Sequence, residues 1–275
     1  MLSNNWRAIA LVGPAALFTV LFFVVPLAAM LVISLSGADG VSLDNYRHFL
    51  SQPSYVRALV NSLQVTIVVT VISVLVAYPL AWILAERVPV RWQRAALLLT
   101  ILPFWTSYVV RSYSWLLLLG ERGVINRALV GSGLLDQPLL LASTRTATVI
   151  GFVHFFTMLL TLTIYASFKQ LSPSYRKAAA DLGANPFQTF RHIVLPLTLP
   201  GIMVGAFLAF VLAIGDYVTP QLLGGNNELL MPQLIIQQIG RRADAPLAAA
   251  LSIILMVVIS LAYLACARWL KLERA

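Results

Sequence analysis

The chain has 275 residues, of which 60% are hydrophobic and 11% are charged, and it carries a formal net charge of +9. A soluble domain carries roughly 25% charged residues, so this composition excludes an ordinary soluble globular protein. Continuous apolar runs recur along the sequence, and a helix needs roughly 20 such residues to cross a membrane. Continuity favours helices over a β-barrel, whose strands alternate in polarity. We therefore predict an all-α polytopic membrane protein.

The apolar runs predict six transmembrane helices within a single transmembrane domain that covers residues 1–275. The predicted spans are 8–35, 59–84, 96–118, 146–168, 198–220 and 246–268. The first run is longer than the roughly 7–15 apolar residues of a signal peptide, so we expect it to remain as a membrane anchor. Pro26, Pro79 and Pro103 fall within these spans and are expected to kink or end them.

The positions of Lys and Arg predict the orientation, because positive residues gather on the cytoplasmic side of a membrane. With a cytoplasmic N-terminus, most positive side chains fall on the inner side, and six spans then place both termini in the cytoplasm. The inner set comprises Arg7, Arg87, Arg91, Arg94, Lys169, Arg176, Lys177, Arg191, Arg268, Lys271 and Arg274. This asymmetry explains the net positive charge, and we expect no nucleic-acid partner. The outer segments 37–58, 119–145 and 221–245 are expected to form loops, with short interfacial helices in the first two.

Residues 169–197 form a charged, helix-breaking loop between two apolar runs. Ser172 and Pro173 predict the start of a helix, because a serine hydroxyl can cap free N–H groups and proline suits the first helical position. Gly183 predicts the end of this helix, because glycine adopts the left-handed conformation without a penalty. The first half of the loop is therefore predicted to be a short capped helix.

The second half of the loop repeats the same signals. Asn185 and Pro186 predict a second helix start, and Pro196 and Pro200 are expected to end that helix. The alanines at 178–180 are expected to keep one face of the first helix smooth. A compact helix–turn–helix with such a face suits docking into a groove on another protein.

The stretch that begins at Lys177, KAAADLGANPFQTFRHIVLP, resembles the cytoplasmic coupling loop of binding-protein-dependent ABC importer permeases. That signature begins with Glu-Ala-Ala, continues to a spaced glycine and ends with Ile-x-Leu-Pro. Lys177 stands here in place of the usual Glu, which puts in doubt any salt bridge of that position with an ATPase. The resemblance implies that the ATPase-coupling residues are Lys177, Ala178, Ala179, Asp181, Gly183, Ala184, Ile193, Leu195 and Pro196.

Four further stretches look like the polyamine branch of these permeases, closest to the first permease subunit of the spermidine and putrescine systems. They are SLDNYRHFL, YPLAWILAER, PFWTSYVVRSYSW and GDYVTPQLLGG. The resemblance implies a type I ABC importer permease fold and a place in the bacterial inner membrane. It further implies a second permease subunit, a periplasmic substrate-binding protein and two cytoplasmic ATPase subunits that hold the ATP and Mg. Related members carry opines, phosphonates or ferric ion, so those solutes stay open.

Ionisable residues at membrane depth usually face a cavity or a partner. Tyr108, Arg111 and Trp115 share one face of a helix, and Trp105 lies just before them in the sequence. One interpretation is a translocation wall of aromatic and hydroxyl groups. The other is an arginine that reaches outward or pairs structurally, because its charge would repel a cationic solute.

Asp216 and Tyr217 are predicted near the outer end of the fifth span. A carboxylate beside an aromatic ring can hold an ammonium group through charge and ring-face attraction. Alternatively, Tyr217 is an interfacial residue and Asp216 pairs with Arg111. His154 in the fourth span is either a hydrogen-bonded core histidine or a transport residue.

Gly201 and Gly205 have the spacing that lets two membrane helices approach closely. Both packing against a second permease subunit and packing within this chain fit that spacing. Walker-type, HExxH and GxSxG motifs are missing from the sequence, so we predict a transport subunit rather than an enzyme, with no metal site and no cofactor bound by this chain. The rival interpretation is an ion-coupled secondary transporter, a class that tends to carry inverted repeats with broken helices.

Overall fold

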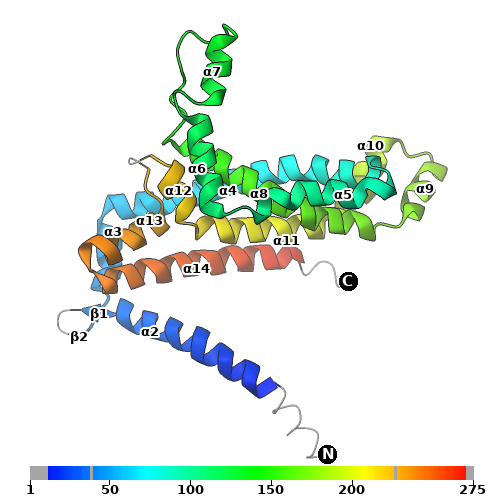
Figure 1. Ribbon diagram of the computed structural model, residues 1–275. Helices are drawn as coiled ribbons and strands as arrows, with labels where there is room; N and C mark the ends of the chain where they lie inside the picture. The colour runs from blue at the N-terminus through cyan, green and yellow to red at the C-terminus, as the bar shows by residue number, and fades with distance from the viewer. Residues whose placement is uncertain (1–11, 38–39, 226–227, 271–275) are drawn as a thin grey trace, which may run out of the picture. The chain divides into compact units, whose positions relative to one another are not determined.

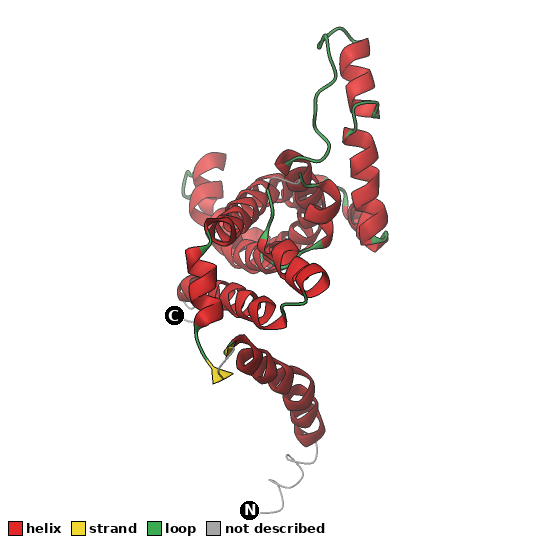
Figure 2. Cartoon of the chain, turned by 90° about the vertical axis from the view of Figure 1, so that its left-hand side faces the viewer, coloured by secondary structure: helices red, strands yellow, loops and turns green. Residues whose placement is uncertain are grey.

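The computed structural model describes residues 12–37, 40–225 and 228–270, of which residues 266–270 are described as backbone only (Figure 1). The predicted inner cations Arg7, Lys271 and Arg274 lie outside these residues. Helix dominates, and strands in the described residues are confined to one short hairpin (Figure 2). The prediction of an all-α membrane protein is confirmed. The chain divides into two compact units, Met1–Arg57 with Leu234–Ile259 and Ala58–Gln233 with Ser260–Ala275.

Five described helices are long and apolar enough to cross a membrane. They are Val12–Ser34, Pro53–Arg87, Arg145–Gln170, Pro186–Ile214 and Ala245–Ala265. A bent pair, Val90–Trp105 and Tyr108–Gly131, makes a sixth candidate span if its two helices, which meet at 90°, cross together.

The span predicted over 96–118 is therefore not one continuous helix. Helix α5 (Val90–Ile101) passes into the 3₁₀ turn η3 (Leu102–Trp105), and α6 (Tyr108–Leu119) begins after two extended residues. Pro103 lies inside η3 and supplies no backbone N–H to continue the α-helical ladder. The sequence predicted a kink or an end at this proline. In the structure α5 ends just before it, and the chain changes direction by 90°.

The first unit contains the π-helical turn η1 (Val20–Val24), α2 (Val25–Ser34), the strands β1 (Ser36–Gly37) and β2 (Gly40–Val41), and α3 (Asp44–Ser51). Its later part holds the end of α13 (Met231–Gln237), η5 (Gln238–Arg242) and most of α14 (Ala245–Leu270). The corner between α2 and α3 is fixed by polar side chains. The hydroxyls of Ser34 and Tyr46 lie 2.7 Å apart, and Asn45 Nδ2 donates to the Ser34 carbonyl at 3.0 Å.

The second unit carries the helices that position the candidate sites. They are α4 (Pro53–Trp82) from Ala58 onward, η2 (Ile83–Arg87), α5, η3, α6, α7 (Val124–Gly131), α8 (Arg145–Gln170), α9 (Pro173–Asp181), α10 (Pro186–Thr189), η4 (Phe190–Val194), α11 (Leu195–Ile214) and α12 (Val218–Leu223). Its apolar core centres on α8, whose Phe152, Phe156, Leu160 and Ile164 are buried against residues of α4 and α11.

Helices α8 and α11 approach closely at two glycines of α11 (Figure 1). A Cβ atom on Gly201 would lie 2.0 Å from Ser167 Oγ and 2.9 Å from the Thr163 carbonyl oxygen. A Cβ atom on Gly205 would lie 2.3 Å from Thr163 Oγ1. The glycine spacing was interpreted as packing either against a second subunit or within the chain. In the structure both glycines pack within the chain, against α8.

The prediction that Pro196 and Pro200 end the second loop helix is wrong. A continuous helix runs from Pro186 to Ile214, through α10, η4 and α11. Pro196 falls in the first turn of α11 and Pro200 within it. The π turn η4 ends at Val194, two residues before Pro196. The wider π turn relieves the clash that a proline ring makes with the carbonyl one turn earlier. The second loop helix is therefore the first turn of the following span.

Candidate coupling hairpin and translocation residues

The hairpin (residues 172–189) starts with a capped helix. Ser172 Oγ accepts a hydrogen bond from the Ser174 N–H at 3.3 Å, and Pro173 occupies the first position of α9. At the other end Gly183 has φ +79°. The Gly183 N–H donates to the Ala180 carbonyl and the Ala184 N–H donates to the Ala179 carbonyl, each at 2.9 Å. This pair of bonds is a Schellman motif, so the predicted start and end of the first helix are confirmed.

The second helix of the hairpin starts with a reciprocal capping box. Asn185 Oδ1 accepts from the Gln188 N–H at 2.8 Å, and Gln188 Oε1 accepts from the Asn185 N–H at 2.9 Å. Such a box satisfies two N–H groups that a helix end otherwise leaves free. The turn between α9 and α10 is thus fixed by local bonds, and the hairpin keeps its shape as it projects from the spans (Figure 1).

The hairpin exposes large apolar side chains. Leu182 is 88% exposed, Phe187 68% and Tyr175 53%. Large exposed apolar side chains on a projecting element are typical of surfaces that a protein or a membrane covers.

The predicted coupling residues do not all lie on this surface. Exposed are Lys177, Ala178, Asp181, Gly183 and Pro196, whereas Ala184, Ile193 and Leu195 are half-buried. Ala179 is 4% exposed, so this alanine packs inward instead of extending the smooth outer face that the sequence predicted. Its small side chain lines a cavity of about 470 Å³ between α9 and η4.

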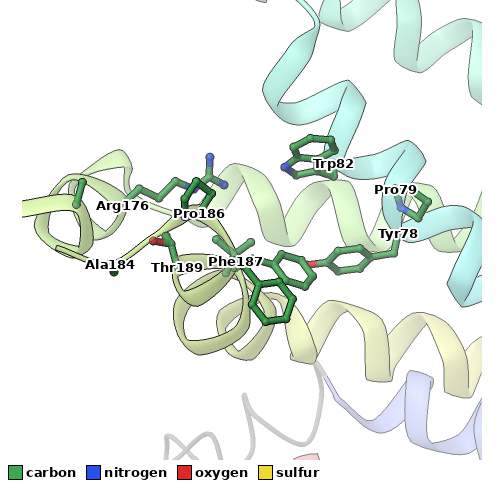
Figure 3. A pocket seen from close by; sticks show the side chains of 11 residues that line it. Tyr78, Pro79, Trp82, Arg176, Ala184, Pro186, Phe187 and Thr189 are labelled. Carbon is green, nitrogen blue, oxygen red and sulfur yellow. The ribbon is translucent and has the colours of Figure 1, made fainter. Parts of the chain in front are cut away.

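A larger apolar cavity of about 690 Å³ separates the hairpin from the end of α4 (Figure 3). Tyr78, Pro79 and Trp82 of α4 lie on one side of it, and Arg176 and Phe187 of the hairpin lie on the other. The sequence did not single out this meeting of α4 with the hairpin.

Tyr78 ties three spans together beside this cavity. Its hydroxyl lies 3.1 Å from the hydroxyl of Thr198 on α11. Its ring centroid lies 5.4 Å from that of Phe168 on α8 and 5.9 Å from that of Phe190 in η4. A polar tyrosine among apolar residues near the end of a span could have suggested such a contact. The sequence could not show its partners, because they are distant along the chain.

Glu86 and Arg176 form an ion pair between η2 and α9. Their side chains are 27% and 32% exposed. Glu86 is the acidic residue that follows the second apolar run, which was the available signal. Its partner lies 90 positions further along the chain, so the sequence alone did not reveal the pair.

Tyr108 and Asp216 meet at the other candidate site. The Tyr108 hydroxyl donates a hydrogen bond to the Asp216 carboxylate and lies 2.5 Å from the Thr219 hydroxyl. The same carboxylate accepts from the Val218 N–H at 2.8 Å and from the Thr219 N–H at 3.4 Å. Asp216 thus joins α6 to the start of α12 and places a carboxylate beside an aromatic ring.

Arg111 is 8% exposed and does not reach outward. Its guanidinium carbon lies 4.6 Å from the ring centroid of Phe155 and 5.0 Å from that of Tyr108. Its Nη1 donates to the Pro103 carbonyl at 3.2 Å, and among the described residues it forms no ion pair with Asp216. Arg111 therefore satisfies a carbonyl at the corner between α5 and α6 while stacking on aromatic faces.

The remaining predicted pathway residues are distributed more widely. Trp115 Nε1 donates to His154 Nδ1 at 3.1 Å, and both side chains line an apolar cavity of about 470 Å³. His154 is thus hydrogen-bonded and half-buried beside a cavity, which fits both alternatives given for it. Trp105 is 77% exposed, and Tyr217 is half-buried next to Asp216. The structure brings Tyr108, Arg111 and Asp216 into one neighbourhood and leaves the Trp105 side chain exposed.

Apolar spans that pack around buried aromatic and polar groups, with a capped hairpin between two of them, are the architecture of a transmembrane permease. The chain belongs to the family of binding-protein-dependent transport system inner membrane components, whose family model matches residues 67–272. It is a multi-pass protein of the inner membrane. The family resemblance predicted from the sequence is confirmed.

Named relatives support this assignment. The chain is 32% identical over 270 residues to the spermidine/putrescine transport system permease protein PotB of Haemophilus influenzae, covering 95% of this chain and 93% of that protein. It is 36% identical over 220 residues to PotB of Escherichia coli, covering 80% of this chain and 79% of that protein.

The fold is also similar to solved structures. A chain in the crystal structure of a bacterial ABC transporter involved in the import of the acidic polysaccharide alginate superposes with a TM-score of 0.81. That match covers 98% of this chain and 96% of the other at 17% identity. At this identity the likeness concerns the fold, and the fold is that of a type I importer permease.

Proposed function

We propose that this chain is a permease subunit of an ATP-driven importer for spermidine, putrescine or similar small cationic amines. The observation that carries the proposal is the likeness to PotB, which extends over 95% of the chain at 32% identity. The permease would form the translocation pathway with a second permease subunit, which receives the amine from a periplasmic binding protein.

The hairpin is the proposed attachment point for a cytoplasmic ATPase. Its caps hold α9 and α10 in a fixed turn, and Leu182, Phe187 and Tyr175 offer apolar surface to a partner. A rigid hairpin would pass the movement of the ATPase to the spans better than a flexible loop, because a flexible loop deforms when its partner moves. Two ATPase subunits, one for each permease, would supply the energy.

The orientation follows from the same assignment. The hairpin must face the cytoplasm to meet an ATPase, and the cations Arg87, Arg91, Arg94 and Lys169 then lie on the same side, as positive residues do in inner-membrane proteins. Both chain ends are cytoplasmic in this arrangement if the bent pair of helices crosses the membrane once.

The proposed amine contact is the carboxylate of Asp216, with Tyr108 and Tyr217 beside it. A carboxylate and neighbouring aromatic rings provide the charge and ring-face attraction that bind an ammonium group. Arg111 is not assigned to the amine, because its guanidinium is bound to the Pro103 carbonyl and to two rings. Arg111 instead stabilises the turn between α5 and α6 through its hydrogen bond to the Pro103 carbonyl.

Reconstitution of the complex tests the proposal. The chain is expressed with its genomic neighbours and purified, and bound ATPase is identified by mass spectrometry. Proteoliposomes are then assayed for uptake of radiolabelled spermidine, putrescine, an opine, a phosphonate and ferric ion, with the binding protein present. ATP-dependent uptake of an amine supports the proposal. Uptake that needs an ion gradient and no ATPase would instead identify a secondary transporter, and uptake of a different solute would overturn the amine assignment.

A further inference from the structure

The hairpin is joined to its surroundings in two different ways. Along the chain it continues into α8 at one end and into η4 and α11 at the other. Helix α4 is not adjacent to it in sequence and faces it across the cavity of about 690 Å³ (Figure 3). Atoms on opposite sides of a cavity make no packing contact. Beside the cavity, Tyr78 of α4 packs on Phe190 of η4, just after the hairpin.

The ion pair of Arg176 with Glu86 bridges this separation. Arg176 belongs to α9 and lines the cavity, whereas Glu86 lies in η2 at the end of the α4 span. The two side chains are about two-thirds buried, and such a pair is screened by salt less than a pair on the open surface. It is therefore a direct polar link between the hairpin and a span that the chain itself does not attach to it.

One end of this link lies in a π turn, and a second π turn follows the hairpin. Glu86 lies within η2 (Ile83–Arg87), and the hairpin leads into η4 (Phe190–Val194). Single π turns inside helices occur frequently at functional sites. Arg176 contacts Glu86 through Nη1, while its Nη2 is buried without a hydrogen-bond partner in the structure. The arginine thus contacts the carboxylate through one nitrogen, unlike the two parallel bonds of a bidentate arginine–carboxylate pair.

We infer that the Arg176–Glu86 pair is the positioning contact through which movement of α9 reaches the end of α4. This inference rests on the proposed function, since it requires an ATPase that moves the hairpin. The ATPase would displace α9 directly, and α8 and α11 would follow through the chain. Helix α4 packs on both spans through Tyr78, and Glu86 would add a direct link from α9 to the end of α4, so that three spans respond together.

A charge-swap experiment tests the inference in the reconstituted complex. The variants are Glu86→Arg, Arg176→Glu and the double variant that carries both changes. Three quantities are measured for each: the amount of ATPase that co-purifies, the ATP hydrolysis stimulated by the loaded binding protein, and the spermidine transported per ATP hydrolysed. The control is Arg94→Glu, which reverses an exposed cation on α5.

Each single variant is expected to bind the ATPase normally and to keep stimulated hydrolysis. Spermidine transported per ATP should fall about five-fold or more, the lower end of typical couplings between sites. The double variant should recover most of that loss, because it restores an opposite-charge pair, and Arg94→Glu should match the unchanged chain. A pair with a merely structural role would not lower transport per ATP while hydrolysis persists.

Three results would overturn the inference. Unchanged transport per ATP in both single variants would show that α4 needs no such link. A double variant no better than the single variants would show that the charges act separately. Loss of ATPase binding in the single variants would assign the pair to the folding of the hairpin. The proposed function fails differently, because the unchanged chain would then bind no ATPase or transport no amine.

Discussion

The Tyr108 hydroxyl donates a hydrogen bond to the Asp216 carboxylate, and this bond connects α6 to the start of α12. Asp216 Oδ1 also accepts from the Val218 N–H, so one carboxylate both fixes a helix start and carries the negative charge of the site. The two roles can be separated by substitution.

Asp216→Asn is expected to weaken amine uptake without unfolding the site. Asparagine keeps a carbonyl oxygen for the Val218 N–H but loses the charge. Hydrogen bonds to charged groups contribute about 1.5–3 kcal/mol, so KM for spermidine uptake should rise about ten-fold or more. Uptake kinetics in proteoliposomes measure this, and stimulated ATP hydrolysis should persist. Tyr108→Phe is the matched variant, because it removes a hydroxyl and leaves the carboxylate charged. Unaltered kinetics in Asp216→Asn would remove Asp216 from the amine site.

Gly183→Pro should abolish uptake while the chain still inserts into the membrane. Gly183 has φ +79° and its N–H donates to the Ala180 carbonyl. Proline holds φ near −65° and has no N–H, so it breaks both features of the turn. Uptake assays and membrane fractionation measure the two outcomes. Gly183→Asn is the control, since asparagine tolerates the left-handed conformation and should retain most uptake. Normal uptake in the proline variant would count against a docking role for the hairpin.

Gly201→Ala should destabilise the contact between α8 and α11. The added methyl group would lie 2.0 Å from Ser167 Oγ and 2.9 Å from the Thr163 carbonyl oxygen. A change of side-chain rotamer can move Ser167 Oγ but not a backbone oxygen, and overpacking of this kind costs about 1–3 kcal/mol. Thermal unfolding in detergent should show a lower Tm. Gly131→Ala has open space around its Cβ position, and its Tm should not fall. An equal Tm for Gly201→Ala and the unchanged chain would contradict the close approach.

Asn126→Ala should loosen the segment that follows α6. Asn126 is 1% exposed, and its Nδ2 donates to the carbonyls of Gly120 and Leu139 at 3.0 and 2.9 Å. Its Oδ1 accepts from the Leu139 N–H at 2.8 Å. Each buried group left without a partner costs about 1–3 kcal/mol. Hydrogen exchange of the Leu139 amide should therefore accelerate, whereas Ser132→Ala, a change at an exposed residue of the same region, should leave it unchanged. Equal protection in Asn126→Ala would show that the loop is held by other contacts.

Local signals predicted the hairpin well. Ser172, Pro173 and Gly183 specify the limits of α9 through bonds between neighbours in the chain, and Asn185 with Gln188 does the same for α10. Local signals failed at Pro196, because the π turn before it lets the helix continue. At Pro103 they predicted a kink or an end, and the two helices there meet at 90°.

The sequence by itself determined that the chain is a helical membrane protein and where its hairpin begins and turns. Run length, polarity and helix caps are properties of neighbouring residues, so they can be read without the fold. Only the tertiary structure decided which distant groups meet. Tyr78 with Thr198, Glu86 with Arg176, and Tyr108 with Asp216 are each about 90 or more positions apart. Their pairing depends on how the spans pack and bend. The periodicity of one helix shows which face is apolar, but it does not show which other helix packs against that face.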